Sequence, residues 1–117
     1  MEPVFDRKGK TIAWLMEGVL FNLGGRPIAF LSKNSVVSYR AKYLGVLDKG
    51  FIRDRSGHAV AFLRGASGGP MPPVPQVPPV PPVPQIPPVP PVSPIAPAPA
   101  VQSLSWSTLA WESFLNQ

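Results

Sequence analysis

The stretch FDRKGKTIAWL (residues 5–15) returns at sixteen-residue intervals as FNLGGRPIAFL (residues 21–31), VSYRAKYLGVL (residues 37–47) and RDRSGHAVAFL (residues 53–63). Six columns of these stretches keep their character. They hold a turn residue (Gly9, Gly25, Ala41, Gly57), a basic residue (Lys10, Arg26, Lys42, His58) and four apolar positions (Ile12, Ile28, Leu44, Val60; Ala13, Ala29, Gly45, Ala61; Trp14, Phe30, Val46, Phe62; Leu15, Leu31, Leu47, Leu63). Four apolar columns in register indicate a protein built from four copies of one small unit.

Each unit predicts two β-strands and two tight turns. Asp or Asn opens the first turn in three copies, and glycine closes it, because glycine adopts a left-handed backbone at no steric cost. A longer strand follows, and Gly18 and Asn34 mark second turns of the kind that join β-hairpins. The sequence therefore predicts an all-β domain of four tandem 16-residue β-hairpin repeats with pseudo-fourfold symmetry.

The units DRKGKTIAWL, NLGGRPIAFL, SYRAKYLGVL and DRSGHAVAFL resemble the bacterial 4-fold beta flower domain family. The resemblance covers residues 1 to about 69, and members of that family often continue into a proline-rich tail. It implies four β units around a central axis. It implies no activity and no catalytic residues. The third repeat departs most from the pattern, with Ala41 in the glycine column and Val46 in the aromatic column.

Composition divides the chain into three parts. Residues 1–66 hold the β domain, with repeats at about 3–18, 19–34, 35–50 and 51–66. Residues 67–102 form a Gly/Pro-rich arm, since 16 of the 18 prolines lie between Pro70 and Pro99, and residues 103–117 are expected to form a short amphipathic helix with two tryptophans. A domain of this size is marginal by itself, so we expect it to be stabilised by its own tail or by other copies.

Charge and cysteine content narrow the setting. All 11 lysines and arginines precede residue 66, where the net charge is +6, and Glu112 is the one charged residue after that point. A basic domain favours an anionic partner, with modest weight. The chain has no cysteine, no apolar N-terminal signal and no run of about 20 apolar residues, so we expect a cytoplasmic protein with no membrane role.

Alternation along the long strand makes both of its faces apolar, whereas a half-exposed strand alternates apolar with polar residues. We place the alanine/glycine column and the four leucines toward the barrel axis. The other face then forms an outer surface of Ile12, Trp14, Ile28, Phe30, Leu44, Val46, Val60 and Phe62. We expect the tail or another subunit to cover this surface. The alternative is a closed barrel whose second face is partly exposed.

The stretch PPVPPVPQIPPVPPV (residues 78–92) places Val or Ile at every third residue. Polyproline II has three residues per turn, so these side chains share one edge of the arm. The edge consists of Met71, Val74, Val77, Val80, Val83, Ile86, Val89, Val92, Ile95, Ala98, Val101 and Leu104. We expect it to pack against the β domain, a neighbouring subunit or another arm. A stiff spacer and an SH3-type ligand are weaker alternatives, because a spacer needs no apolar edge and no flanking cation is present.

Within residues 103–117, Ser105 or Ser107 is expected to cap a short helix. Its apolar face would hold Trp106, Leu109, Ala110 and Phe114, with Trp111 and Leu115 beside it. Such a short helix is marginal alone, so it should dock. It packs on its own domain, or it is a docking peptide that the arm presents to another protein.

The basic column of Lys10, Arg26, Lys42 and His58 is a candidate anion-binding site, because fourfold placement could direct these side chains at one phosphate. The alternative is four solvated cations after four turns. We expect no catalytic residues, metal or cofactor, since His58 is the one histidine and no phosphate-binding or hydrolase motif is present.

These observations favour a non-enzymatic protein-interaction or self-assembly module. The expected partner is another copy of the chain or an unidentified protein, rather than nucleic acid or membrane. The expected contact residues are the outer surface named above, Val80, Val83, Ile86 and Val89 of the arm, and Trp106, Leu109, Trp111 and Phe114. The alternative is a small module that binds an anion or nucleic acid through the basic column.

Overall fold

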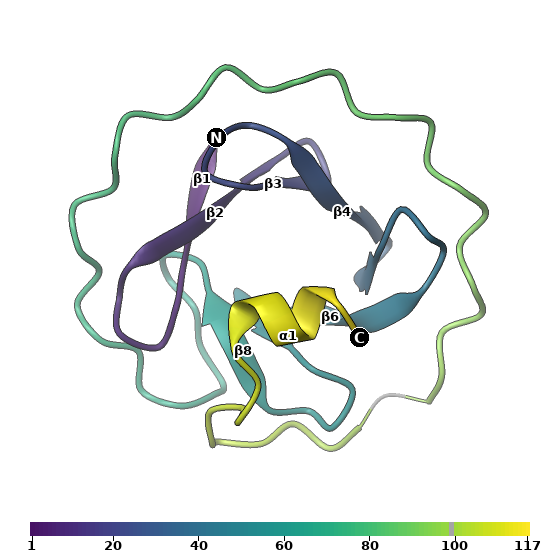
Figure 1. The fold of residues 1–117 in the computed structure, drawn as a ribbon. Helices are drawn as coiled ribbons and strands as arrows, with labels where there is room; N and C mark the ends of the chain where they lie inside the picture. The colour runs from purple at the N-terminus through teal and green to yellow at the C-terminus, as the bar shows by residue number, and fades with distance from the viewer. Residues whose placement is uncertain (99) are drawn as a thin grey trace.

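The computed structural model describes residues 1–98 and 100–117. Eight antiparallel strands form a closed barrel in which each strand pairs with its neighbours in sequence. They are β1 (Glu2–Phe5), β2 (Thr11–Met16), β3 (Val19–Phe21), β4 (Pro27–Ser32), β5 (Ser35–Val37), β6 (Tyr43–Asp48), β7 (Phe51–Arg53) and β8 (Ala59–Phe62), followed by helix α1 (Trp111–Leu115). The prediction of an all-β fold of four hairpin repeats, here called petals, is confirmed (Figure 1).

Two kinds of turn lie at opposite ends of the barrel, because the strands run alternately up and down. The turns at residues 6–10, 22–26, 38–42 and 54–58, called the petal turns, follow the odd-numbered strands. In the first, the Oδ1 of Asp6 accepts the backbone N–H groups of Lys8 and Lys10 at 2.9 and 3.0 Å. Asn22, Ser38 and Asp54 accept the equivalent pairs. The other end has two-residue hairpin turns such as Glu17–Gly18, whose φ values of 50° and 76° suit a primed turn.

A β-bulge recurs at one position in every petal. Val4 pairs with Ala13 and Phe5 with Thr11, so Ile12 has no partner across the strand pair. Ile28, Leu44 and Val60 are bypassed in the same way. All four residues lie in or against the barrel core with the alanine column. Their expected place on the outer surface was therefore wrong, because strict alternation of side chains fails at a bulge.

The aromatic column does lie on the outside of the barrel wall, and it is buried. Trp14, Phe30 and Phe62 are only 2%, 6% and 2% exposed. The described part of the proline-rich arm passes around the outside of the barrel wall (Figure 1). Phe62 packs against Trp106 of the C-terminal segment, with ring centroids 6.1 Å apart. We attribute the burial of the outward aromatic column to these segments. The molecule is a disc with extents of 37 × 35 × 21 Å.

Helix α1 closes the barrel at the end that carries the petal turns (Figure 1). Phe114 is fully buried among the core residues, and a Cβ atom added to Gly45 would lie 3.2 Å from its ring. Trp111 stacks on Phe114 with ring centroids 5.5 Å apart. The C-terminal segment thus completes the barrel core, as a domain of this size requires.

Candidate functional site

The arm is fastened to the barrel by backbone hydrogen bonds to the petal turns. The N–H of Gln76 donates to the carbonyl of Gly9 at 2.8 Å, and that of Gln85 to Gly25 at 2.9 Å. The N–H of Ser103 donates to Gly57 at 3.1 Å. Glycine serves two purposes here: Gly9 has φ +82°, and a Cβ on it would lie 2.7 Å from the carbonyl oxygen of Val74.

These contacts reveal a second repeat, nine residues long, in the arm. The nonapeptides are PPVPQVPPV (residues 72–80), PPVPQIPPV (residues 81–89), PPVSPIAPA (residues 90–98) and PAVQSLSWS (residues 99–107). Their fifth positions are Gln76, Gln85, Pro94 and Ser103, which include all three donors. Nine residues of polyproline II span about 28 Å, so one nonapeptide reaches from one petal to the next.

The third petal lacks this hydrogen bond, and both of its partners have changed. Pro94 stands at the donor position and has no N–H. Ala41 stands at the glycine position and keeps a positive φ of 64°, which is costly for a residue with a Cβ. At the other three petals the space beside the glycine is filled by a carbonyl of the arm. A methyl group in that space would collide with such a carbonyl, so the absence of a glycine and the absence of a donor agree with each other.

We therefore expect the double substitution Ala41→Gly with Pro94→Gln to create a fourth backbone hydrogen bond. In a double-mutant cycle by urea unfolding, the coupling between the two changes should be favourable by about 0.5–1.5 kcal/mol, the usual net worth of one hydrogen bond. Each single variant controls for the changed backbone entropy. Additive effects would show that the two positions do not meet.

Arg53 joins the two ends of the arm. Its side chain is only 1% exposed, and its guanidinium lies 5.6 Å from the centre of the Phe51 ring. One terminal nitrogen donates to the carbonyls of Gly57 and Ser103, both at 2.7 Å, and the other donates to Gly68 at 2.8 Å. Gly68 lies where the arm leaves the barrel and Ser103 where it returns, so this one side chain closes the ring.

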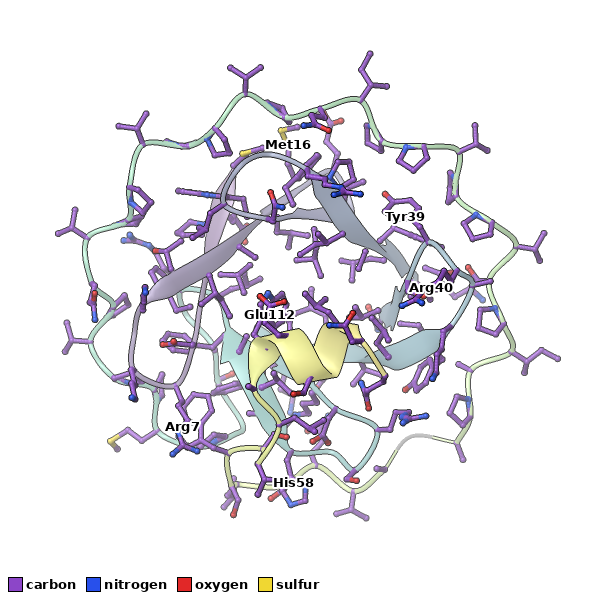
Figure 2. The ribbon with its side chains drawn as sticks, viewed as in Figure 1. Arg7, Met16, Tyr39, Arg40, His58 and Glu112 are labelled. Carbon is purple, nitrogen blue, oxygen red and sulfur yellow. The ribbon has the colours of Figure 1, made fainter. Side chains whose placement is uncertain are left out.

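The apolar edge of the arm points away from the barrel, where its side chains project around the rim (Figure 2). Some prolines of the other two edges, such as Pro73, Pro78 and Pro82, are half-buried, and others, such as Pro79 and Pro88, are exposed. We call the outward side chains the apolar belt; they are 73–97% exposed and comprise Met71, Val74, Val77, Val80, Val83, Ile86, Val89, Val92, Ile95, Val101 and Leu104. The expectation that this edge packs on the β domain was wrong. Backbone hydrogen bonds, together with the half-buried prolines, hold the arm, which leaves the branched side chains free.

The C-terminal segment differs from the expected helix. The chain bends at Leu104 and Ser105, and Trp106 then forms a parallel bridge with Ala59. Trp106 packs 6.1 Å from the ring centres of both Phe51 and Phe62. The helix has only five residues and excludes Trp106, Leu109 and the expected capping serines. The segment packs on its own barrel. Ala59 of β8 donates to the carbonyl of Ser105 and accepts from the N–H of Ser107, and this pairing around Trp106 competes with helix formation.

The basic column does not form one cluster. Each of its four residues, Lys10, Arg26, Lys42 and His58, lies on a different petal turn. Figure 2 shows the separation of three of these turns, because the labelled side chains of Arg7, Arg40 and His58 lie at separate places around the molecule. Three hollows of about 390, 420 and 310 Å³ lie between the petal turns and the C-terminal segment. The third is lined by Arg26 and Arg40 with Glu112 of α1. Burial raises the pKa of the Tyr39 and Tyr43 phenols, so both stay neutral near pH 7.

Ser107, Asp54 and His58 meet without forming a catalytic triad. The Ser107 hydroxyl donates to Asp54 Oδ2 at 2.5 Å, and His58 Nδ1 lies 3.9 Å from the other carboxylate oxygen. The imidazole is not between serine and aspartate, so it is not placed to take the serine proton. The contact anchors the C-terminal segment to the fourth petal turn. Within residues 1–98 and 100–117, no three His, Asp or Glu side chains are grouped as a metal site would require.

Two features of this site were missed from the sequence, and each had a visible signal. The nonapeptide period was hidden by the stronger period of three, although Gln76 and Gln85 recur at the same position. Arg53 occupies the column that Phe5, Phe21 and Val37 fill in the other petals. A cation in an apolar column indicates a buried polar contact.

Comparison with known proteins supports the same architecture. The family model of the 4-fold beta flower protein matches residues 2–115, so the match includes the arm and the C-terminal segment as well as the petals. The comparisons with curated proteins and with solved structures found no match. Across the described parts of the chain, no helix has the length and apolar character to span a membrane.

Proposed function

This chain belongs to the 4-fold beta flower protein family, and we propose that it is a non-enzymatic interaction module whose copies associate through the apolar belt. The observation that carries the proposal is the exposure of the belt. Eleven large apolar side chains stand 73–97% exposed on an arm that is already held by other groups. The fold of the single chain gives these side chains no packing role. Exposed apolar rows of this extent mark interaction surfaces.

The chemistry of the belt suits a second copy. Residues 65–111 contain no charged side chain, so two belts meet without repulsion or an unpaired charge. Side chains along each belt stand about 9.3 Å apart, which leaves room for those of a facing belt to interdigitate. A reducing, cytoplasmic setting in a bacterium belongs to the same proposal and is supported by the cysteine-free composition.

The shape of the disc predicts weak, repeated contacts. Two convex rims touch over a short arc, so one contact buries far less than the roughly 800 Å² per partner of a stable interface. Each buried apolar side chain still contributes about 1.5–3 kcal/mol before the cost of association. The belt surrounds the disc, so one molecule can contact several others at once. Association should therefore grow steadily with concentration instead of stopping at a dimer.

The test is the substitution of Val80, Val83, Ile86 and Val89 by threonine, which keeps the β-branched shape and removes the apolar surface. We expect the weight-average mass of the wild-type chain in sedimentation equilibrium to rise above 12.6 kDa as concentration increases, and that of the variant to stay near 12.6 kDa. The control is Gln76→Thr with Gln85→Thr, which changes exposed side chains of the arm outside the belt and keeps both N–H donors.

Two outcomes would contradict the proposal. A wild-type mass of 12.6 kDa up to millimolar concentration would exclude self-association and leave a partner protein as the occupant of the belt. Equal loss of association in the threonine variant and in the glutamine control would assign the effect to the arm as a whole instead of the belt.

A further inference from the structure

The basic side chains gather at one end of the disc. Each petal turn carries one exposed arginine, at Arg7, Arg26, Arg40 and Arg55. Lys8, Lys10 and Lys42 are exposed on the same turns. The acidic groups at this end are Asp6, Asp54 and Glu112. Seven cations against three carboxylates give this end, called the petal-turn face, a net charge of +4.

The rest of the surface is neutral. Lys33, Lys49 and Arg64 are balanced there by Glu2, Glu17 and Asp48. Arg53 accounts for the remaining positive charge and is buried in the wall. Nearly all of the net charge of +5 is thus directed to one side of the molecule. A field of this kind attracts a polyanion to one face only.

We propose that the petal-turn face binds the phosphate backbone of double-stranded nucleic acid without reading its sequence. The cations are spread around the perimeter, so they fit an extended row of phosphates better than one small anion. Arginine holds phosphate oxygens through two parallel N–H groups, and one exposed arginine lies on each of four turns. Arg55 donates its Nε–H to Gln117 Oε1 at 3.1 Å, so it would use its terminal N–H groups. The face measures at most 37 × 35 Å, close to one turn of B-DNA at about 34 Å.

An anionic membrane is the competing partner for a basic face. Peripheral binding to lipid needs apolar side chains that enter the headgroup region. Among the described residues of the petal turns, Leu23 is the one large apolar side chain in the exposed class, at 47%. The outward belt lies on the rim and is not directed along the same axis (Figure 2). The observations therefore favour nucleic acid.

Glu112 lies on α1 at the middle of this face and is exposed (Figure 2). Its carboxylate repels any phosphate that crosses the centre. The structure thus predicts an unusual direction of effect for one substitution: Glu112→Gln should tighten binding by about threefold at low salt, because one like-charge repulsion is removed.

The test measures binding of a labelled 24-base-pair DNA duplex of random sequence to the full chain by fluorescence anisotropy, from 20 to 200 mM KCl. We expect a plot of the logarithm of the binding constant against the logarithm of the salt concentration to have a slope of about −3.6 to −5.4, which corresponds to four to six phosphate contacts. Lys8→Glu with Lys42→Glu should reduce the slope by about 2 and weaken binding at low salt about 30-fold or more.

The matched control is Lys33→Glu with Lys49→Glu. It gives the whole chain the same net charge as the first double variant but places the new carboxylates at the opposite end of the disc. We expect it to weaken binding by less than about threefold, because those lysines lie away from the proposed contact. Equal weakening by the two double variants would show a net-charge effect and overturn the assignment. Binding to phosphatidylserine vesicles without binding to the duplex would also overturn the assignment. A lower affinity of Glu112→Gln for the duplex would do the same. The threonine variant of the apolar belt leaves the petal-turn face unchanged. Failure of the self-association proposal and failure of the DNA-binding proposal can therefore be told apart.

Discussion

Arg53→Met is expected to lower the free energy of unfolding by about 3–5 kcal/mol, among the largest effects of any single substitution in this chain. Methionine has a similar length and no charge, but it leaves the carbonyls of Gly57, Ser103 and Gly68 without the guanidinium that they share. The loss of hydrogen bonds to a buried charge costs more than that of neutral ones. Urea unfolding followed by tryptophan fluorescence measures the change.

The matched control is Arg55→Met, two residues further along the chain and exposed. It should change stability by less than about 0.5 kcal/mol, as surface substitutions usually do. Hydrogen exchange adds a specific readout. In Arg53→Met the amides of Gln76, Gln85 and Ser103, which donate to the petal turns, should exchange faster than those of β2 and β4. If protection of the arm is unchanged, Arg53 does not close the ring.

Phe114→Ala is expected to destabilise the fold by about 3–5 kcal/mol, the usual cost of truncating a fully buried phenylalanine. Phe114 is 0% exposed, and it fills the end of the barrel beside Gly45 and under Trp111. The small residues of the alanine column cannot expand to fill the space. Thermal unfolding by calorimetry measures the loss.

Ser113→Ala provides the control for this substitution, because Ser113 is the exposed neighbour on the same helix. It should leave the melting temperature nearly unchanged. If Phe114→Ala leaves the melting temperature equally unchanged, then α1 does not complete the core. The alternative that residues 103–117 are a docking peptide for another protein would then be favoured.

The sequence predicted the repeat, its turns and the four hairpins arranged with pseudo-fourfold symmetry, because these depend on local patterns that each petal repeats. The positive φ of Gly9, Gly25 and Gly57 and the hydrogen bonds of Asp6 and Asn22 follow from residue type alone. Burial of the aromatic column was also predicted, because large apolar side chains on the second face had to be removed from water, although only half of the eight residues assigned to that face lie there.

Other features depend on how segments meet, and local patterns do not contain that information. The bulge at Ile12 shifts a side chain from one face to the other while the sequence still reads as plain alternation. The outward direction of the belt depends on the backbone of Val74 meeting Gly9 from one particular side. The helix has only five residues because residues 105–107 pair with Ala59 of β8 instead.

The match between nine residues of arm and sixteen residues of barrel sets a rule for how such a chain can change its length. One residue added in the middle of the arm would turn everything after it by about 120°, which would aim the valines inward and carry the next donor past its acceptor. Three added residues would restore the orientation but still miss the acceptor. Lengthening is therefore tolerated only in whole steps, with one nonapeptide of the arm added for each new petal of the barrel.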